Sequence, residues 1–159
     1  TIELKLREVN LPAQPILSSL TYKNINRIYF RLIRAHYYSE KQDNQRRDHE
    51  KEPTKYLTRK AFMDWSKELP NEGDFQSHNL QLRVPDLSNG YYILLSSPDP
   101  DFNAKSLFQI NKFWVSNLSF IQRNDIKGSM DIFILSRNLG APLNNVKLEI
   151  QKSDYNYKN

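Results

Sequence analysis

Histidines are the side chains of this sequence best suited to proton transfer or metal binding near neutral pH, and there are three: His36, His49 and His78. They lie far apart along the chain, and none stands at a metal-ligand spacing from a second histidine. A catalytic histidine also needs a nucleophile and an orienting acid, which the sequence does not identify. We therefore interpret all three as turn or surface residues. Cysteine is absent, which excludes disulfides, thiolate metal sites and thiol nucleophiles within this segment.

Carboxylates offer a second kind of chemistry, because hard oxygen ligands bind calcium. The acidic motif "PDPD" at residues 98–101 lacks the spacing of a helix-loop-helix calcium site, and Asp-Pro pairs are ordinary turn formers. A carboxylate pair for glycoside hydrolysis depends on a cleft, which a sequence alone does not supply. The sequence thus assigns no catalytic, cofactor-binding or metal-binding residue, and we expect a chain that is not an enzyme and has no cofactor.

Basic residues outnumber acidic ones and give a formal charge of +5, but the surplus is spread along the chain. Between Glu40 and Lys60, seven Lys or Arg accompany five Asp or Glu, a net of +2. Nucleic-acid binding needs an uncompensated basic patch, so we expect no nucleic-acid partner. The phosphate-binding loop and the dinucleotide glycine pattern are also absent. No apolar run is long enough to cross a bilayer, and we expect no membrane insertion by this segment.

Aromatic residues are the last candidates, since they make up 12% of the chain and exposed rings can hold a ligand. Trp65 and Trp114 have apolar neighbours, a pattern more typical of core or inter-module packing than of a ligand platform. An adhesive or carbohydrate-binding surface is an open alternative, and its first suspects are four tyrosines: Tyr37, Tyr38, Tyr91 and Tyr92. A hydrolase on a sandwich scaffold is a second alternative, which requires a pocket that joins His36 or His78 to acids.

The elements that would position these side chains are mostly strands. Alternation of apolar and polar residues, or a continuous apolar run, predicts strands at 1–9, 16–22, 27–38, 78–85 and 91–97. The last of these is the most apolar and is typical of a central strand. Over 27–38, Ile28, Phe30 and Leu32 share one predicted face, although the length of this segment also permits a helix.

Two segments break the strand pattern. Residues 39–53 contain no apolar residue, so we predict a solvated loop or a disordered insertion there. The stretch "LTRKAFMDWSKELP", residues 57–70, has helical spacing instead, with Phe62 and Trp65 on one face and Pro70 at the end. The sequence therefore predicts one short helix that packs against a sheet.

Residues 98–106 carry two prolines and no periodicity, which indicates a domain boundary. Beyond it we predict three strands: 112–123, 130–138 and 146–151. Gly140 permits a sharp turn, and Pro142 presets the backbone before the last strand. Short, regularly spaced strands without β–α alternation predict a mainly all-β chain of antiparallel β-sandwich modules. Three strands cannot close a sandwich. We therefore expect one module at 1–106, with a polar insertion at about 39–57, and a second module at 107–159 that is incomplete or whose strands complete the first sandwich.

Together these motifs resemble the N-terminal half of bacterial alpha-2-macroglobulin-like proteins. The first module carries "YKNINRIYFRLIR", then Trp65 closely followed by Leu69-Pro70, then "LQLRVPDLSNGYYILLSS", similar to a "P-x-L-x-x-G-x-Y" strand pair that ends a family module. The second part, "FWVSNLSFIQR" followed by "DIFILSRNLGAPLNNVKLEI", is similar to the start of the following module, where Leu143 and Val146 would anchor the next strand. The resemblance covers most of the chain, apart from the insertion.

The resemblance implies a macroglobulin- or fibronectin-like sandwich with no chemistry of its own. Such modules scaffold a long chain that traps proteases and rearranges when a bait region is cut, in many members with a Cys-Leu-Glu-Gln thioester. This segment has no cysteine, so it cannot contain that thioester. The resemblance to the N-terminal half implies a position upstream of the bait region and any thioester. The implied partners are neighbouring modules of the same chain and, through the full-length protein, proteases.

Localisation is implied in the same way. The sequence begins at Thr1 without a visible signal peptide, and we expect an internal fragment of a longer protein. Bacterial members of the family are exported, often as periplasmic lipoproteins. We therefore expect the full-length protein in the periplasm or attached to the cell envelope, with its lipid-bearing cysteine upstream of Thr1.

Overall fold

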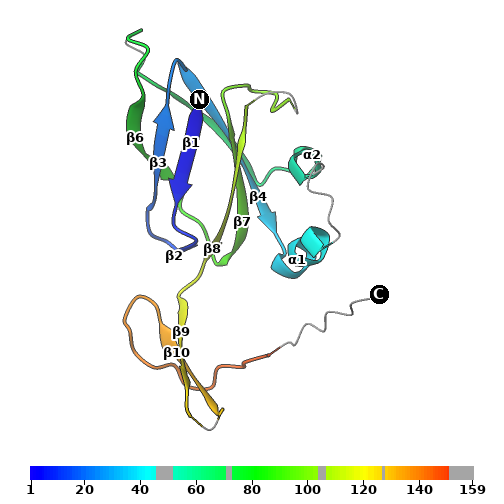
Figure 1. Cartoon of the computed structure of the whole chain (residues 1–159), viewed down its shortest axis with the longest axis vertical. Helices are drawn as coiled ribbons and strands as arrows, with labels where there is room; N and C mark the ends of the chain where they lie inside the picture. The colour runs from blue at the N-terminus through cyan, green and yellow to red at the C-terminus, as the bar shows by residue number, and fades with distance from the viewer. Residues whose placement is uncertain (46–51, 71–72, 104–106, 127, 151–159) are drawn as a thin grey trace. The chain divides into compact units, whose positions relative to one another are not determined.

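The computed structural model describes residues 1–45, 52–70, 73–103, 107–126 and 128–150. The chain divides into two compact units, Thr1–Asn117 and Leu118–Asn159, each of which contains β-strands (Figure 1). The sequence placed the boundary earlier, between residues 106 and 107. The difference arises because strand β8 (Gln109–Val115) pairs with β7 (Gly90–Ser97) and so belongs to the first unit.

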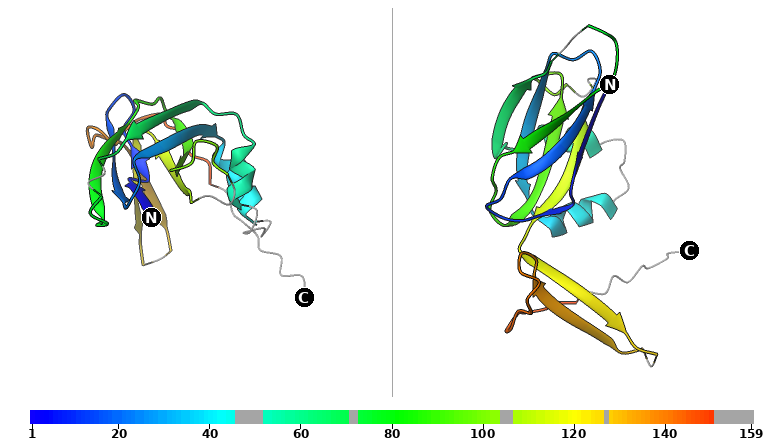
Figure 2. Two further views of the ribbon diagram at one scale, coloured as in Figure 1. Left: turned by 90° about the horizontal axis from the view of Figure 1, so that it is seen from above. Right: turned by 90° about the vertical axis from the view of Figure 1, so that its left-hand side faces the viewer.

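The first unit is an antiparallel sandwich of two β-sheets, which confirms the predicted fold class (Figure 2). The smaller sheet has the order β1-β3-β6, with β1 at Ile2–Leu6, β3 at Ile16–Tyr22 and β6 at His78–Val84. The larger sheet has the order β2-β8-β7-β4-β5, with β2 at Val9–Asn10, β4 at Arg27–Ala35 and β5 at Met63–Glu68. The strand pairs are antiparallel except for the short parallel pair of β2 with β8.

The main core lies between the two sheets, because alternation turns one apolar face of each strand inward. In β3, Leu20 is fully buried while Leu17, on the other face of the strand, is 54% exposed. Full burial of such an aliphatic side chain contributes about 1.5–3 kcal/mol. The buried face of β4 consists of the three residues that the sequence predicted: Ile28, Phe30 and Leu32.

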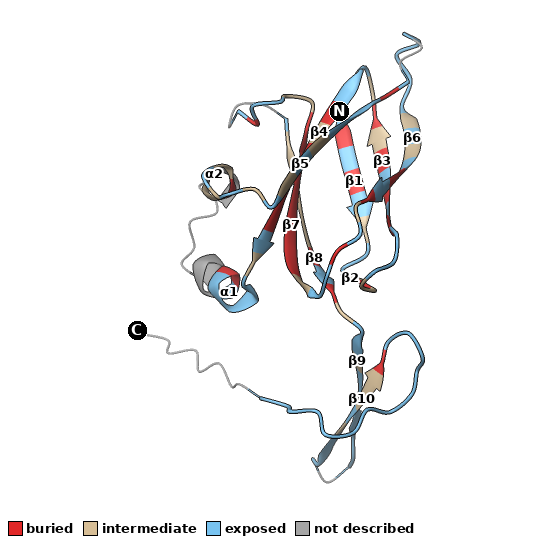
Figure 3. Ribbon diagram, turned by 180° about the vertical axis from the view of Figure 1, so that it is seen from behind, coloured by how far each residue is buried: buried red, intermediate tan, exposed pale blue. Residues whose placement is uncertain are grey.

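The larger sheet is covered on its outer face as well, which makes β7 buried along nearly its whole length (Figure 3). Helices α1 (Tyr37–Gln45) and α2 (Glu52–Leu57) lie on this side (Figure 1). A second cluster joins the outer side chains of β4 and β7 to Tyr56 of α2 and to Phe102 in the loop after β7. The prediction that 91–97 is a central strand is therefore confirmed.

The N-terminal strand is divided between the two sheets, where the sequence predicted one strand over 1–9. β1 belongs to the smaller sheet and β2 to the larger one. Side-chain amides of β8 satisfy the backbone of β1: Gln109 accepts from Leu4 N at 2.7 Å and donates to Ile2 O at 2.8 Å, and Asn111 donates to Leu4 O at 3.0 Å. These bonds join the two sheets along one side and protect an edge that would otherwise expose unpaired backbone groups.

The helix predicted over 57–70 is wrong, because residues Met63–Glu68 form β5. This segment pairs with β4, and Phe62 N and Leu69 N extend the ladder to Leu32 O and Asn26 O at 2.7 and 2.8 Å. A short isolated helix is only marginally stable in water. The open edge of β4 instead offers backbone hydrogen bonds to every second residue of the segment. Trp65 still packs on the sheet, stacked on Phe30 with ring centroids 5.0 Å apart.

The polar insertion at about 39–57 is also different from the prediction. Its described parts are helical, α1 at one end and α2 at the other, rather than a solvated loop. Glu40 in α1 is only 2% exposed and Tyr56 in α2 is fully buried. Residues 46–51 lie outside the described residues. The polar composition of this segment predicted exposure to solvent. Glu40 departs from that prediction because it is a charged residue that is buried.

The second unit has a β-hairpin of β9 (Leu118–Asn124) and β10 (Met130–Ser136), with Ile121 opposite Phe133 and Phe120 opposite Ile134. The sequence predicted β10 well, but it joined β8 and β9 into one strand. Several apolar side chains of the hairpin are exposed, among them Leu118, Phe120, Ile121, Met130 and Phe133. Figure 3 shows β9 mostly in the colour of exposed residues. A two-stranded hairpin is marginally stable on its own.

The third strand predicted for the second unit, 146–151, does not form over its described residues 146–150. The chain turns back after β10, with Gly140 at a φ of 68° as a tight turn requires. A single bridge then joins Leu135 to Pro142, and Leu143 N donates to Ile134 O at 2.9 Å. Residues 146–150, in which apolar and polar residues alternate, pair with no strand in the described part of the chain.

Candidate functional site

A row of aromatic side chains lies on the outer face of the larger sheet, at the end where β4 runs into α1. The register places Ala35 of β4 opposite Tyr91 of β7, and Tyr91 opposite Trp114 of β8. Directly opposed residues of antiparallel strands project on the same face. The Tyr91 and Trp114 rings accordingly meet with centroids 4.9 Å apart at 51°.

The start of α1 adds two tyrosines to this row. Tyr37 packs against Tyr91 at 5.4 Å, nearly edge-on at 82°, and against Trp114 at 5.2 Å. Tyr38 contacts Tyr37 at 5.8 Å. Tyr91 is buried, whereas Tyr37, Tyr38 and Trp114 are 39%, 60% and 36% exposed. The cluster therefore has a buried base and exposed ring faces, and we call Tyr37, Tyr38, Tyr91 and Trp114 the aromatic cluster.

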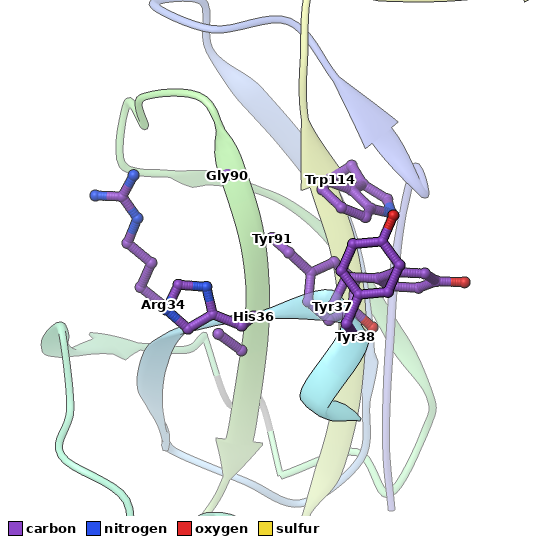
Figure 4. Close-up of a pocket in the computed structure, with 8 residues that line it drawn as sticks. Arg34, His36, Tyr37, Tyr38, Gly90, Tyr91 and Trp114 are labelled. Atoms are coloured by element: carbon purple, nitrogen blue, oxygen red, sulfur yellow. The ribbon is translucent and has the colours of Figure 1, made fainter. Parts of the chain in front are cut away.

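An open hollow of about 580 Å³ lies beside the aromatic cluster. Figure 4 shows the cluster on one side of β7, with Arg34 and His36 on the other side and Gly90 between them. Both Arg34 and His36 are exposed, and Arg34 Nη2 donates to Asn89 O at 3.1 Å. The residues that line the hollow thus include the aromatic cluster together with Arg34 and His36. The register pairs Arg34 with Tyr92, so its side chain projects on the other face of the sheet from Tyr91.

The pKa of the Tyr91 phenol is raised, first by burial and then by the negative charge of Glu40 and the neighbouring Tyr37. Burial removes water that would stabilise a phenolate, so the neutral form is favoured. The Tyr91 phenol is therefore harder to ionise than an ordinary tyrosine, which argues against a role as a proton acceptor.

Glu40, one turn into α1, is held by basic and phenolic groups of α2 and the residues after it. Tyr56 Oη donates to Glu40 Oε2 at 2.9 Å, Arg59 pairs with Oε1, and Lys55 Nζ lies 3.7 Å from Oε2. The cations of Lys55, Arg59 and Lys112 also approach the Tyr56 ring at 4.9, 5.2 and 5.5 Å. Pairing of this kind offsets the cost of burying a carboxylate. These contacts fix α1, and with it Tyr37 and Tyr38, against the sheet.

The three histidines are not brought together. His36 lies beside the hollow, and His49 is outside the described residues. His78, at the start of β6, is 2.9 Å from Asp74 Oδ1 through Nε2, and its ring packs on Tyr22. The pKa of Asp74 is lowered by the hydrogen bond from Gln76 N and then by that from His78. This pair is exposed and joins a loop to a strand, which is a structural role.

The "PDPD" motif forms a turn. Asp99 accepts from Asp101 N at 3.0 Å and from Asn103 N at 3.3 Å, while its own N–H donates to Ser97 Oγ. Within the described ranges of the chain, no group of three or more His, Asp or Glu side chains is arranged to hold a metal ion. In the same ranges, no helix is long and apolar enough to cross a membrane.

The structure divides the aromatic residues that the sequence suggested as candidates for ligand binding into two groups. Tyr37, Tyr38 and Tyr91 meet Trp114 in the aromatic cluster, although the sequence favoured packing for Trp114. Tyr92 is instead fully buried between the sheets, where it stacks on Phe113 at 5.8 Å. Adjacent residues of a strand point to opposite faces, so Tyr91 and Tyr92 could not both have lined one surface.

Sequence reasoning missed two residues of this region, Arg34 and Glu40. Arg34 fell within the predicted strand 27–38 without a role of its own, and Glu40 fell within the predicted solvated loop or disordered insertion at 39–53. A signal existed for Arg34, because it is a basic residue near the end of the predicted strand, two residues before His36. Nothing local distinguishes Glu40 from the other acids of its segment, since its partners Tyr56 and Arg59 follow more than fifteen residues later.

Comparison with known proteins gives one structural likeness. No protein-family model matches the sequence, and no curated protein matches it. The chain is similar to the crystal structure of native alpha-2-macroglobulin from Escherichia coli spanning domains NIE-MG1, with a TM-score of 0.57 over 89% of this chain and 73% of that one, at 13% sequence identity. At this identity the likeness concerns the fold alone: the chain has an alpha-2-macroglobulin-like β-sandwich fold.

Proposed function

We propose that this chain is a non-catalytic structural module of an exported bacterial protein that traps proteases in the manner of alpha-2-macroglobulin. In this role, the sandwich keeps neighbouring modules in place along the chain. It also transmits the rearrangement of the chain from one module to the next. Its partners are neighbouring modules of the same chain and, through the full-length protein, proteases. The proposal also assigns the full-length protein to the periplasm or the cell envelope, where a lipid anchor would retain it.

The observation that carries the proposal is the extent of the structural likeness. The first unit has 117 of the 159 residues, about 74% of the chain, while the likeness covers 89%. The similarity must therefore reach into the second unit. A sandwich followed in order by the start of another β-unit supports a segment of a multi-module chain and not an isolated domain.

The surface of the second unit gives separate support. Ile121 and Phe133, which stand opposite each other and share one face of the hairpin, are 55% and 49% exposed. Contiguous exposed apolar side chains mark surfaces that pack against other protein. A neighbouring module of the same chain is the partner that this proposal assigns to them.

The experiment compares two substrates of one protease in the presence of the protein that carries this chain. Chymotrypsin mixed with this protein should keep its activity on a short chromogenic peptide and lose it on casein, because a trapped protease admits only small substrates. Leu20→Asp places a charge in the core and should abolish protection of casein. Leu17→Asp on the exposed face of the same strand is the matched control and should preserve it.

Two results would contradict the proposal. The first is casein cleavage at an unchanged rate in the presence of the wild-type protein. The second is loss of chymotrypsin activity toward the peptide and casein alike, since that indicates blocking of the active site instead of enclosure.

A further inference from the structure

We propose that the open side of the sandwich, between the free edges of β5 and β6, binds an extended acidic segment of a second polypeptide. The segment would pair with the backbone of β6 and place alternate side chains, an acid among them, in the groove beside that strand. This binding activity is additional to the scaffold role. It depends on the first unit only, and it stands or falls separately from protease trapping.

The two sides of the sandwich differ in how their sheet edges are covered. On one side, Gln109 and Asn111 of β8 bond the outward backbone groups of Ile2 and Leu4 in β1. On the other side, β5 ends the larger sheet and β6 ends the smaller one, and neither pairs with a further strand in the described ranges (Figure 1). Such an edge presents unpaired N–H and C=O groups, to which another chain can add a strand.

The register identifies the backbone groups that β6 leaves unpaired. Lys23 N donates to Thr1 O at 3.1 Å, so these two residues form a hydrogen-bonded pair that continues the register of β1 with β3. Hydrogen-bonded pairs alternate along an antiparallel ladder, so the even-numbered residues of β3 turn their backbone toward β6. Their partners in β6 are also even-numbered. The N–H and C=O groups of Asn79, Gln81 and Arg83 therefore face the open side.

A groove of about 280 Å³ lies beside this edge. Its apolar surface comes from Phe30 of β4, Trp65 of β5, and Leu82 and Val84 of β6. Trp65 is only partly buried there. A strand that pairs with β6 turns every second side chain toward the larger sheet. The groove thus fits a strand that carries apolar side chains at alternate positions.

Lys67 supplies the charge that selects the partner. It stands opposite the fully buried Ile28, so its side chain projects on the inner face of the larger sheet. Lys67 is exposed and forms no ion pair within the described part of the chain. The described residues that line the groove include no carboxylate, and their other cation, Arg83, pairs with Asp86 at 2.9 Å. An inward lysine opposes pairing of an edge with arbitrary strands and favours a strand that brings an acid to it.

The test uses two synthetic nonapeptides and the whole chain. The acidic probe is Thr-Glu-Thr-Val-Thr-Val-Thr-Glu-Thr, whose symmetric pattern permits either strand direction, and the basic probe has lysine in place of both glutamates. The sequence has two tryptophans, so a Trp114→Phe background leaves Trp65 as the fluorescent reporter in the groove. We expect saturable binding of the acidic probe with a shift in Trp65 emission, about tenfold tighter than binding of the basic probe.

Two pairs of variants locate the site. Lys67→Glu should weaken binding of the acidic probe by about tenfold or more and reverse the preference between the probes. Lys41→Glu, at an exposed position of α1, is its matched control and should bind as the wild type does. Gln81→Pro should abolish binding, because it removes a backbone donor that faces the open side, whereas Gln81→Ala keeps that donor and should bind unchanged. Edge strands tolerate proline where the N–H faces solvent, and circular dichroism checks that each variant folds.

Amide hydrogen exchange of the wild-type chain tests the backbone pairing without a variant. Exchange at Asn79, Gln81 and Arg83 should slow when the acidic probe binds. The proposal is overturned if this exchange is unchanged at a saturating probe concentration, if neither peptide binds, or if Lys67→Glu binds the acidic probe as the wild type does. Sedimentation of the chain alone identifies a second copy as the occupant. A dimer that Gln81→Pro converts to a monomer would therefore also overturn it.

Discussion

At the scale of single residues, the most informative position is Glu40. It is an acid in a polar segment, and yet its carboxylate is among the most buried groups of the chain. Tyr56, Arg59 and Lys55 supply a hydrogen bond and two charges to it. A buried carboxylate is tolerated only with such partners. These contacts join α1 to Tyr56 of α2, which packs in turn on the outer face of the larger sheet.

Replacement of Glu40 by alanine should lower the free energy of unfolding by about 3 kcal/mol, because it removes the acceptor of a buried phenol and the partner of Arg59. Chemical denaturation measures this difference. Glu3→Ala is the control, since Glu3 pairs with Lys5 at the exposed surface and its loss should cost about 0.5 kcal/mol or less. Equal effects of the two changes would show that Glu40 does not anchor the helix.

At the scale of elements, β5 shows that pairing with a sheet edge can outweigh the helical spacing of apolar residues in the local sequence. Its residues suit a helix face as well as a strand, but β4 has an unpaired edge that β5 satisfies over six residue pairs. Ion pairs of Arg27 with Glu68 and of Arg31 with Asp64 add to this pairing on the exposed side. On the other side of the sandwich, the amides of Gln109 and Asn111 play the corresponding role for β1.

Trp65→Ala tests the packing of this edge. The ring stacks on Phe30 but is partly exposed, so the expected loss is about 2 kcal/mol, below the value for a fully buried aromatic residue. Lys67→Ala, at an exposed position of the same strand, should change stability by about 0.5 kcal/mol or less. Urea unfolding measures both. A loss below about 1 kcal/mol, or helical Cα chemical shifts over residues 63–68, would contradict a strand at this position.

At the scale of the whole molecule, the two units differ in how far they are complete. The first has two sheets with a closed core and a second cluster under its helices. The second has a two-stranded hairpin whose apolar side chains are largely exposed. Burial of apolar area between layers is what makes a domain independently stable, and the described residues provide it in the first unit.

The polypeptide of residues 1–117 should therefore fold on its own and unfold in one cooperative transition. Its stability should lie within about 1 kcal/mol of that of the full chain, because the first unit contains its own core. The peptide of residues 118–159 alone should show no cooperative transition by circular dichroism. Loss of cooperativity in the longer piece would show that its core depends on residues after 117.

The sequence by itself determined the sandwich and the sides of its strands. Burial in β1, β3, β4 and β6 follows the alternation of apolar residues, because the direction of a side chain in a strand depends only on its position in the chain. The tertiary structure alone decided that 63–68 is a strand, that Glu40 is buried and that Tyr37, Tyr91 and Trp114 meet. Each of these outcomes depends on a partner that is distant in sequence. The partner is the free edge of β4 for residues 63–68, a phenol of another helix for Glu40, and a ring on a neighbouring strand for the aromatic residues. Such partners are chosen by the register of the strands and by the available buried volume, which local sequence does not encode.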